Sequence, residues 1–200
     1  MSTTIADSAT LQLGPAAAGS RFSPDEFDAA AFVEGYRYEL IGGVLVVSPA
    51  TLINERDPNE ELGHWLRNYR DDHPPGGALY FTLHEHDVFV GDDRRRVERA
   101  IWAGLGRLPQ VTETPTIAVE FVSAGKRNLL RDYEQKRVEY EHIGVREYWV
   151  FNRFNCTLTV FRPEQDRQVF SQQQIYTTPL LPGFELPLGR LFEIANRWDS

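Results

Sequence analysis

Glu120 is the residue whose position most strongly indicates chemistry. It stands inside Thr116–Val122, a continuous run of β-forming residues that is typical of a central strand buried on both faces. An unpaired carboxylate in such a strand is strongly unfavourable, so Glu120 must lie at an exposed strand end, be paired, or bind a cation. A satisfied structural ion pair and a cation-binding site are therefore both open interpretations.

The segment that follows predicts a helix over residues 128–143, capped by Asn128 and ended by Gly144. Asp132, Lys136 and Tyr140 are spaced by four residues along it, which places them on one stripe. We expect a different, apolar set to face the core: Leu129, Leu130, Val138 and Ile143. The stripe is either a surface Asp–Lys pair or the means of carrying a lysine over the end of the Glu120 strand.

Two further carboxylates occur among residues that predict strands. Glu39 lies between Tyr38 and Leu40, and Glu98 precedes the apolar sequence Ala-Ile-Trp. Each is unremarkable alone. Together with Glu120 and Lys136 they make three carboxylates and one ammonium, which is the inventory for holding a hard divalent cation and handling a phosphate.

Two other groups of residues compete for a chemical role. His84 and His86 alternate along a predicted strand and form a candidate metal pair, but no third ligand follows at an informative spacing, so exposed polar strand residues are the competing interpretation. Cys156 lies in a predicted turn without a nearby histidine, which argues against a nucleophile.

The elements that must position these residues follow from local signals. Ser23-Pro24-Asp25-Glu26 predicts a helix start with a capping box, and Gly42-Gly43 predicts the turn of a hairpin over 38–47. A second helix is predicted to start at Asp57-Pro58, with an apolar face at 62, 65, 66 and 69. Further strands are predicted over 78–90, 98–103, 116–122, 145–151, 157–161 and 168–170, and a short helix over 190–196. The fold class is α/β, with helices around one mixed sheet.

Composition sets the frame for these elements. The chain has 200 residues, with 21 basic and 29 acidic side chains and a formal net charge of −8. We expect an N-terminal tail over residues 1–20 and a single domain over 21–200. An acidic chain does not attract nucleic acid in bulk, so any DNA contact must use a local basic surface. The arginines at 94–99 and the basic residues at 126–137 are candidates, and a solvated, charge-balanced surface is the competing interpretation.

Cysteine content and hydropathy suggest the setting. The single cysteine cannot form an intramolecular disulfide, which fits a reducing, cytoplasmic location. No apolar run is long enough to cross a bilayer, so we expect no integral membrane protein.

Four blocks of the sequence carry a family resemblance. They are YELIGGVLVVSPA, VERAIWAGLG, PTIAVEFVSAGKRN and RDYEQKRVEYEHIGVREYWVFNRF. The blocks resemble the Uma-two family of restriction endonucleases, within the PD-(D/E)XK nuclease superfamily, from about Phe22 to residue 162. The resemblance implies a restriction-endonuclease-like core, with a central mixed β-sheet flanked by α-helices, that binds Mg²⁺ or Mn²⁺ for phosphodiester hydrolysis.

The resemblance also assigns site residues. The family's hairpin acid falls on Glu39, its proline–aspartate position on Val97-Glu98, and its strand glutamate on Glu120. Glu98 is a departure, since an aspartate is usual there and glutamate is one methylene longer. Asn152 also stands where the family often has an aspartate.

The lysine of the superfamily motif is displaced in this chain. It usually follows the strand glutamate by two residues, where this sequence has Val122. As in the Uma-two family, the lysine falls on the next helix at Lys136, with Asp132 and Tyr140 as supporting residues.

The expected function is therefore a metal-dependent DNA endonuclease. Glu98 and Glu120 are the expected metal ligands, Glu39 a further ligand or water-positioning group, and Lys136 the residue that orients water or stabilises the transition state. The expected phosphate contacts are Arg95, Arg96 and Arg127. A homodimer is expected by analogy with nucleases of this fold. The alternative is a catalytically weak or inactive domain that binds nucleic acid or protein.

Overall fold

The computed structural model describes residues 10–73, 77–123 and 131–199. The chain divides into two units, one made of Met1–Ala50 with Gly91–Arg95 and the other of Thr51–Val90 with Arg96–Ser200. Each unit has its own buried apolar cluster among the described residues. That residues 21–200 work as one nuclease domain stays a prediction.

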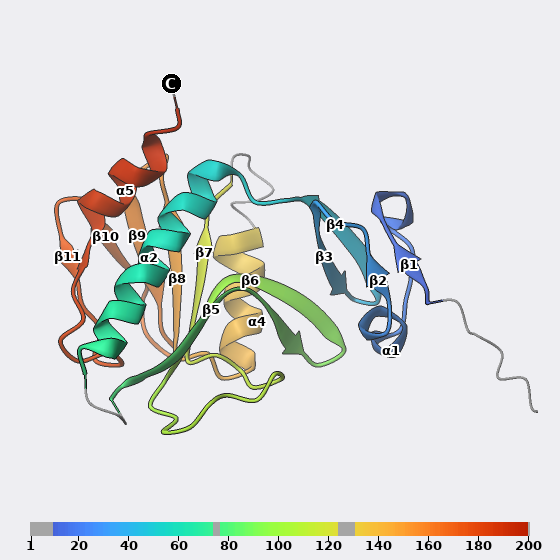
Figure 1. Ribbon diagram of the computed structural model, residues 1–200, viewed down its shortest axis with the longest axis horizontal. Helices are drawn as coiled ribbons and strands as arrows, with labels where there is room; N and C mark the ends of the chain where they lie inside the picture. Colours follow the sequence, from blue (N-terminus) through green and yellow to red (C-terminus); the bar gives the residue numbers. More distant parts are fainter. Residues whose placement is uncertain (1–9, 74–76, 124–130, 200) are drawn as a thin grey trace, which may run out of the picture. The chain divides into compact units, whose positions relative to one another are not determined.

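The first unit is built around a hairpin. Its elements are β1 (Gln12–Leu13), η1 (Pro15–Ala17), α1 (Pro24–Asp28), β2 (Ala31–Phe32), β3 (Tyr36–Ile41) and β4 (Val44–Pro49) (Figure 1). Both glycines of the predicted turn, Gly42 and Gly43, have positive φ, which suits the tight connection between β3 and β4. The predicted capping box is confirmed, because the Ser23 and Glu26 side chains each bond the other's backbone N–H.

Ordered structure begins earlier than the predicted boundary of the tail at residue 20. Residues 1–9 lie outside the described part of the chain, but β1 pairs in parallel with β2, and Leu13 is buried in one cluster with Phe27 and Tyr38. A two-residue strand is too short to show an alternating pattern, so no local pattern predicts it.

The second unit carries a mixed sheet. Its elements are α2 (Ile53–Asp71), β5 (Leu79–Val90), β6 (Asp93–Ala103, whose first residues belong to the first unit), β7 (Ile117–Phe121), η2 (Arg131–Gln135), α4 (Lys136–His142), β8 (Glu147–Asn152), β9 (Thr157–Phe161), β10 (Gln168–Ser171), β11 (Ile175–Tyr176), β12 (Leu186–Pro187) and α5 (Leu188–Asn196). Strands β5 to β10 neighbour one another in chain order. β7 and β8 are parallel, and their other described pairings are antiparallel. The predicted α/β fold class is confirmed.

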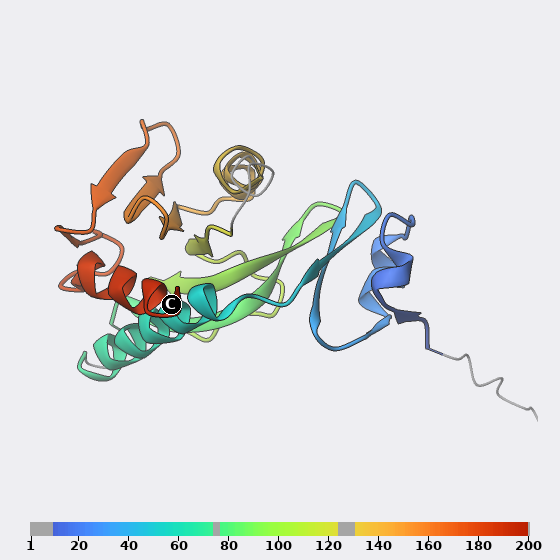
Figure 2. The ribbon, with the colours of Figure 1, turned by 90° about the horizontal axis from the view of Figure 1, so that it is seen from above.

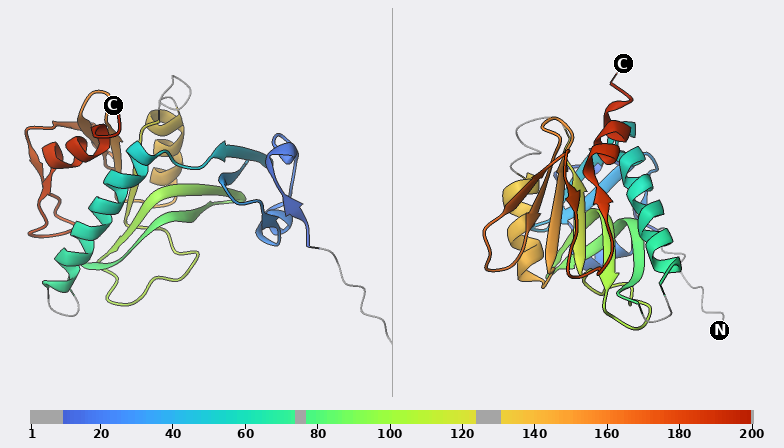
Figure 3. Two further views of the ribbon diagram at one scale, coloured as in Figure 1. Left: turned by 45° about the horizontal axis from the view of Figure 1, so that its top comes forward. Right: turned by 90° about the vertical axis from the view of Figure 1, so that its left-hand side faces the viewer.

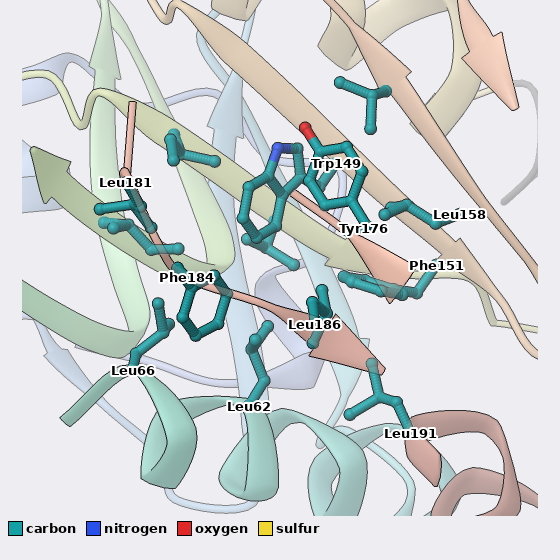
Figure 4. Close-up of a cluster of buried hydrophobic side chains, with 14 of the residues drawn as sticks. Leu62, Leu66, Trp149, Phe151, Leu158, Tyr176, Leu181, Phe184, Leu186 and Leu191 are labelled. Atoms are coloured by element: carbon teal, nitrogen blue, oxygen red, sulfur yellow. The ribbon is translucent and has the colours of Figure 1, made fainter. Parts of the chain in front are cut away.

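Helices cover both faces of this sheet. The views in Figure 2 and in the right-hand panel of Figure 3 place α4 on one side of β7 and β8, and α2 and α5 together on the other. The larger apolar cluster lies on the side with α2 and α5. There, leucines of both helices pack against the aromatic residues of β8 (Figure 4). Leu62, Leu66 and Tyr69 of α2 are buried there as their spacing predicts.

The start of α2 differs from the prediction. The helix begins at Ile53, so Pro58 lies inside it and does not mark its first turn. Proline lacks the N–H that would bond the carbonyl four residues earlier, at Asn54, so α2 lacks that hydrogen bond in its second turn. The cap-like sequence at Asp57-Pro58 therefore misplaced the boundary by about one turn.

A buried carboxylate at the start of β8 fastens the C-terminal segment to the sheet. Glu147 accepts hydrogen bonds from Trp149 Nε1 at 2.8 Å, Tyr176 Oη at 2.9 Å, Thr178 Oγ1 at 2.8 Å and Arg162 Nε at 2.9 Å. Burial and the Glu147 charge raise the pKa of Tyr176 far above its ordinary value, so Tyr176 stays a donor. Glu147 accepts all four hydrogen bonds from side chains of the same unit, so its role is structural.

None of the helices among the described residues combines the length and apolar character that a bilayer crossing requires.

Candidate active site

Glu98 and Glu120 lie on neighbouring strands of the second unit. In the antiparallel pairing of β6 with β7, Arg99 lies opposite Val119, and Glu98 and Glu120 are each one residue further along. Because side chains alternate along strands, both carboxylates belong to the same face as Ala100 and Ala118, the face covered by α4. Both are buried.

Lys136 joins Glu120 from α4. Its Nζ lies 2.7 Å from Glu120 Oε1, and the two side chains are only 1–2% exposed. Tyr140, one turn later, donates its hydroxyl to the same Oε1 at 3.2 Å. Glu120 is thus paired, as one of the two open interpretations requires, and its partner is the lysine that the spacing analysis selected.

The predicted stripe faces the sheet, whereas the predicted apolar face is wrong at Val138. Asp132, Lys136 and Tyr140 are all buried, and Val138 is 56% exposed. Leu129, Leu130 and the predicted cap Asn128 lie outside the described residues. Hydrophobicity alone favoured Val138 for the core, but the buried carboxylate of Glu120 attracts the cationic and hydroxyl side chains instead.

The segment before α4 is a π-helical turn, η2, which carries Asp132. The Asp132 carboxylate accepts from Arg131 Nε at 3.0 Å, and its backbone carbonyl accepts the Tyr148 hydroxyl at 2.9 Å. Burial, followed by the charges of Glu120 and Asp132, raises the pKa of Tyr148 well above its ordinary value, so Tyr148 is a neutral donor. π-helical turns occur frequently at functional sites.

Glu98 is held by the backbone of the neighbouring strand. Its Oε2 accepts the Phe121 N–H at 2.7 Å, a charge-assisted hydrogen bond within the buried part of the sheet. This bond fixes one oxygen of Glu98 beside the residue that follows Glu120.

Glu39 belongs to the first unit. It lies on β3 opposite Val46 and is buried between Tyr38 and Leu40. Its predicted part in the site stays a prediction.

The predicted phosphate contacts differ in their surroundings. Arg96 pairs with Asp87, with Nε 2.8 Å from Oδ1, and its side chain is 27% exposed. Arg95 is 1% exposed and is not presented on the surface where a phosphate contact was expected. Arg127 lies outside the described residues.

The two histidines of the candidate metal pair lie in different surroundings. His86 packs edge-on against Trp102 with ring centroids 5.0 Å apart, and His84 lies 3.6 Å from Glu60 Oε1. Among the described residues, no three His, Cys, Asp or Glu side chains are grouped so that they could hold a metal ion.

The sequence and the fold are both similar to those of known proteins. Residues 24–189 match the model of the Uma2 family, described as "Putative restriction endonuclease". The chain belongs to the Uma2 family. No curated protein matches it. Among solved structures it is similar to "a putative nuclease belonging to DUF820" from Anabaena variabilis, with a TM-score of 0.71 and 16% sequence identity over 87% of this chain and 99% of that chain. At this identity the structural similarity shows the fold alone.

The Uma2 match confirms the predicted family and extends it. It reaches residue 189, beyond the strands near residue 162 that carried the resemblance, and so includes Glu147's partners Tyr176 and Thr178. Sequence reasoning missed Tyr148 and these C-terminal donors, because a tyrosine inside an aromatic strand gives no signal that its hydroxyl is needed.

The family implies a divalent metal ion, and the oxygen atoms that Glu98 and Glu120 offer decide whether these residues fit one. Mg²⁺ prefers oxygen ligands and is commonly held by one or two carboxylates together with water and substrate phosphates. Glu98 and Glu120, on one face of adjacent strands, supply carboxylate oxygens of that kind. The carboxylates of Glu98 and Glu120 therefore fit a divalent metal ion, whose other ligands would be water and substrate.

Proposed function

We propose that this Uma2-family chain is a Mg²⁺- or Mn²⁺-dependent endonuclease that hydrolyses phosphodiester bonds in DNA. The observation that carries the proposal is the buried Glu120–Lys136 pair at 2.7 Å, with Glu98 on the adjacent strand. Glu120 is the fourth of five residues of β7, and ligands of α/β sheets bind outside the carboxyl ends of parallel strands.

Glu98 and Glu120 would hold the metal. When bound, the ion would polarise the scissile phosphate and lower the pKa of a coordinated water. Tyr140 keeps Glu120 in place through the hydrogen bond to Oε1, and the Phe121 amide does the same for Glu98. Glu39 stays a predicted further ligand or water-positioning group.

Lys136 would act on the reacting phosphate. An ammonium has three N–H donors, and Lys136 uses them toward Glu120 Oε1 at 2.7 Å and the Arg96 carbonyl at 3.4 Å. The remaining donor would orient the attacking water or bind a phosphate oxygen, which stabilises negative charge in the transition state. Asp132 supports this arrangement from the preceding turn, where Arg131 and Tyr148 hold it.

DNA contacts, assembly and location belong to the same proposal. Arg96, partly exposed beside Asp87, is the described candidate for a phosphate contact, and Arg127 stays a predicted one. A homodimer would bring two sites to the two DNA strands. The single cysteine supports a cytoplasmic location.

The deciding experiment is cleavage of plasmid DNA in Mn²⁺ by the wild type and by Glu120→Gln. The amide preserves the size of the side chain and removes the charge, so cleavage should fall by about 10²-fold or more. Glu141→Gln, on the exposed side of α4, is the matched control and should cleave like the wild type. Equal cleavage by the wild type and Glu120→Gln would rule out Glu120 as a metal ligand.

The second candidate is a catalytically weak or inactive domain that binds nucleic acid or protein. Two observations favour it: the near-complete burial of Lys136 and Glu120, and the absence of a three-ligand group among the residues that the structure describes. Calorimetric titration with Mn²⁺ separates the candidates. A catalytic site binds the ion in the wild type and more weakly in Glu120→Gln, whereas a scaffold shows no difference.

A further inference from the structure

A buried arginine lies directly behind the proposed site. Arg99 follows Glu98 on β6, so its side chain extends from the opposite face of the sheet, toward α2. It donates to three neutral oxygens: Asn59 Oδ1 at 2.6 Å, the Asn59 carbonyl at 2.7 Å and Thr82 Oγ1 at 3.2 Å. Burial lowers the pKa of Arg99 to about 10. Burying a guanidinium whose hydrogen-bond partners are all neutral is costly, which points to a role for Arg99 beyond packing.

Asn59 connects this arginine to the site. While its Oδ1 accepts from Arg99, its Nδ2 donates to the backbone carbonyl of Glu98 at 2.9 Å. The side-chain amide therefore holds two successive residues of β6. The Arg99 bond also fixes the orientation of the amide, because only the oxygen of Asn59 can accept from a guanidinium.

The neighbouring strand is irregular at the same level. Glu85, inside β5, has a φ of +46°. It lies between Thr82, whose Oγ1 bonds the Ala100 carbonyl, and Asp87, which pairs with Arg96. A positive φ at a non-glycine residue inside a strand is typical of a β-bulge, and this one lies beside the stretch of β6 that contains Glu98. Bulges interrupt strand pairing and re-aim side chains, often beside active sites.

Helix α2 lies unusually close to this point. A Cβ placed on Gly63 would be 2.5 Å from Arg99 Nη2. Arg99 is held by three hydrogen bonds and is fully buried, so it has no room to move aside. The glycine lets the helix approach β6 closely enough for the amide of Asn59, one turn earlier, to reach the strand.

We infer that Asn59 is a positioning residue, whose amide, locked by Arg99, fixes the backbone of Glu98 opposite the β5 bulge. Asn59 thereby fixes the position at which the Glu98 carboxylate accepts the Phe121 N–H. The same position would determine how that carboxylate binds the metal, and this second consequence rests on the proposed function. Asn59 acts through Glu98 from the other face of the sheet.

Two variants separate this role from general packing. Asn59→Asp keeps an oxygen for Arg99 but has no N–H for the Glu98 carbonyl. Thr82→Val, the matched control, removes one Arg99 bond and the Thr82 bond to the Ala100 carbonyl, and it leaves the Asn59–Glu98 bond in place. Should Asn59→Asp not fold, Asn59→Ser replaces it, since a hydroxyl on a shorter side chain weakens the bond to Glu98 without adding charge.

Hydrogen exchange of the Phe121 amide gives the readout, measured by NMR on the full chain without metal. The amide donates to Glu98 Oε2, so its exchange relative to the Val150 amide on β8 reports the position of that carboxylate. We expect exchange about tenfold faster in Asn59→Asp and close to wild type in Thr82→Val. Unchanged exchange in Asn59→Asp, or equal acceleration in both variants, would overturn the inference.

A second measurement separates the inference from the proposed function. Titration with Mn²⁺ should show affinity about tenfold weaker in Asn59→Asp than in the wild type, with Thr82→Val unchanged. If the wild type neither binds Mn²⁺ nor cleaves DNA, the proposed function fails, and the Phe121 exchange still decides the positioning role. If the wild type binds Mn²⁺ and Asn59→Asp binds it equally well, the positioning role fails alone.

Discussion

Two buried glutamates on adjacent parallel strands have opposite surroundings. Glu147, at the start of β8, accepts hydrogen bonds from four side chains, and two of them, Tyr176 and Thr178, tie the C-terminal segment to the sheet. Glu120, near the end of β7, has its Oε1 shared by Lys136 and Tyr140, and Glu98 lies on the next strand. Burial of a carboxylate therefore does not indicate function by itself. The proposed function rests on the second carboxylate and the lysine that lie beside Glu120.

The largest expected effect concerns the Glu147 end. Glu147→Gln breaks the pair with Arg162 and offers an amide N–H where donors now point, so the free energy of unfolding should fall by about 3–5 kcal/mol. Urea denaturation measures this change. Any cleavage activity per folded molecule should be unaltered. A loss below about 1 kcal/mol would contradict the structural role of Glu147.

The next effect concerns the lysine at the Glu120 end. Lys136→Met should lower the turnover rate by about 10²-fold, the usual consequence of losing one transition-state contact. Single-turnover cleavage in saturating Mn²⁺ measures it, with Mn²⁺ affinity determined in parallel. If affinity collapses together with the rate, Lys136 organises the metal ligands and does not act on the phosphate. Lys136→Arg should not restore full activity, because a planar guanidinium does not replace a compact ammonium.

A moderate effect is expected from the length of Glu98. Mg²⁺ demands near-ideal octahedral geometry, so a ligand one methylene longer than aspartate should favour Mn²⁺. Cleavage rates in each metal should show the wild type more active with Mn²⁺, and Glu98→Asp as active or more active than the wild type with Mg²⁺. Glu98→Gln should lose most activity with both ions. Full activity of Glu98→Gln in Mg²⁺ would exclude Glu98 from the site.

The smallest effect concerns acid sensitivity at His86 of β5. Burial lowers the pKa of His86 below its ordinary value of 6.5, so the unfolded chain takes up a proton that the folded chain refuses. Stability should therefore fall as pH drops from about 7 through 6.5, where the unfolded histidine becomes protonated. Urea titrations at several pH values should show a flatter profile for His86→Phe. An unchanged profile would exclude His86 as a source of acid sensitivity.

Much of the site could be predicted because its residues violate local patterns. Glu120 interrupts an apolar strand, and the four-residue spacing of Lys136 selects its partner. Glycine pairs and capping residues likewise predicted the hairpin and α1.

The remainder depends on tertiary contacts. Val138 and Arg95 reversed their expected exposure, because hydrophobicity and charge alone do not say which side of an element faces the interior. The π-helical turn at η2, the bulge at Glu85 and the burial of Arg99 likewise have no signature in residue type or spacing.

The close approach at Gly63 constrains how this protein can evolve. A methyl group at position 63 would collide with the guanidinium of Arg99 while that arginine keeps its three hydrogen bonds, so we expect Gly63→Ala to be unfavourable in the present background because Arg99 must shift. If position 99 first acquires a shorter side chain, the same alanine becomes acceptable and even favourable in the helix. The two positions are therefore epistatic, and the order of their substitutions decides which descendants remain foldable.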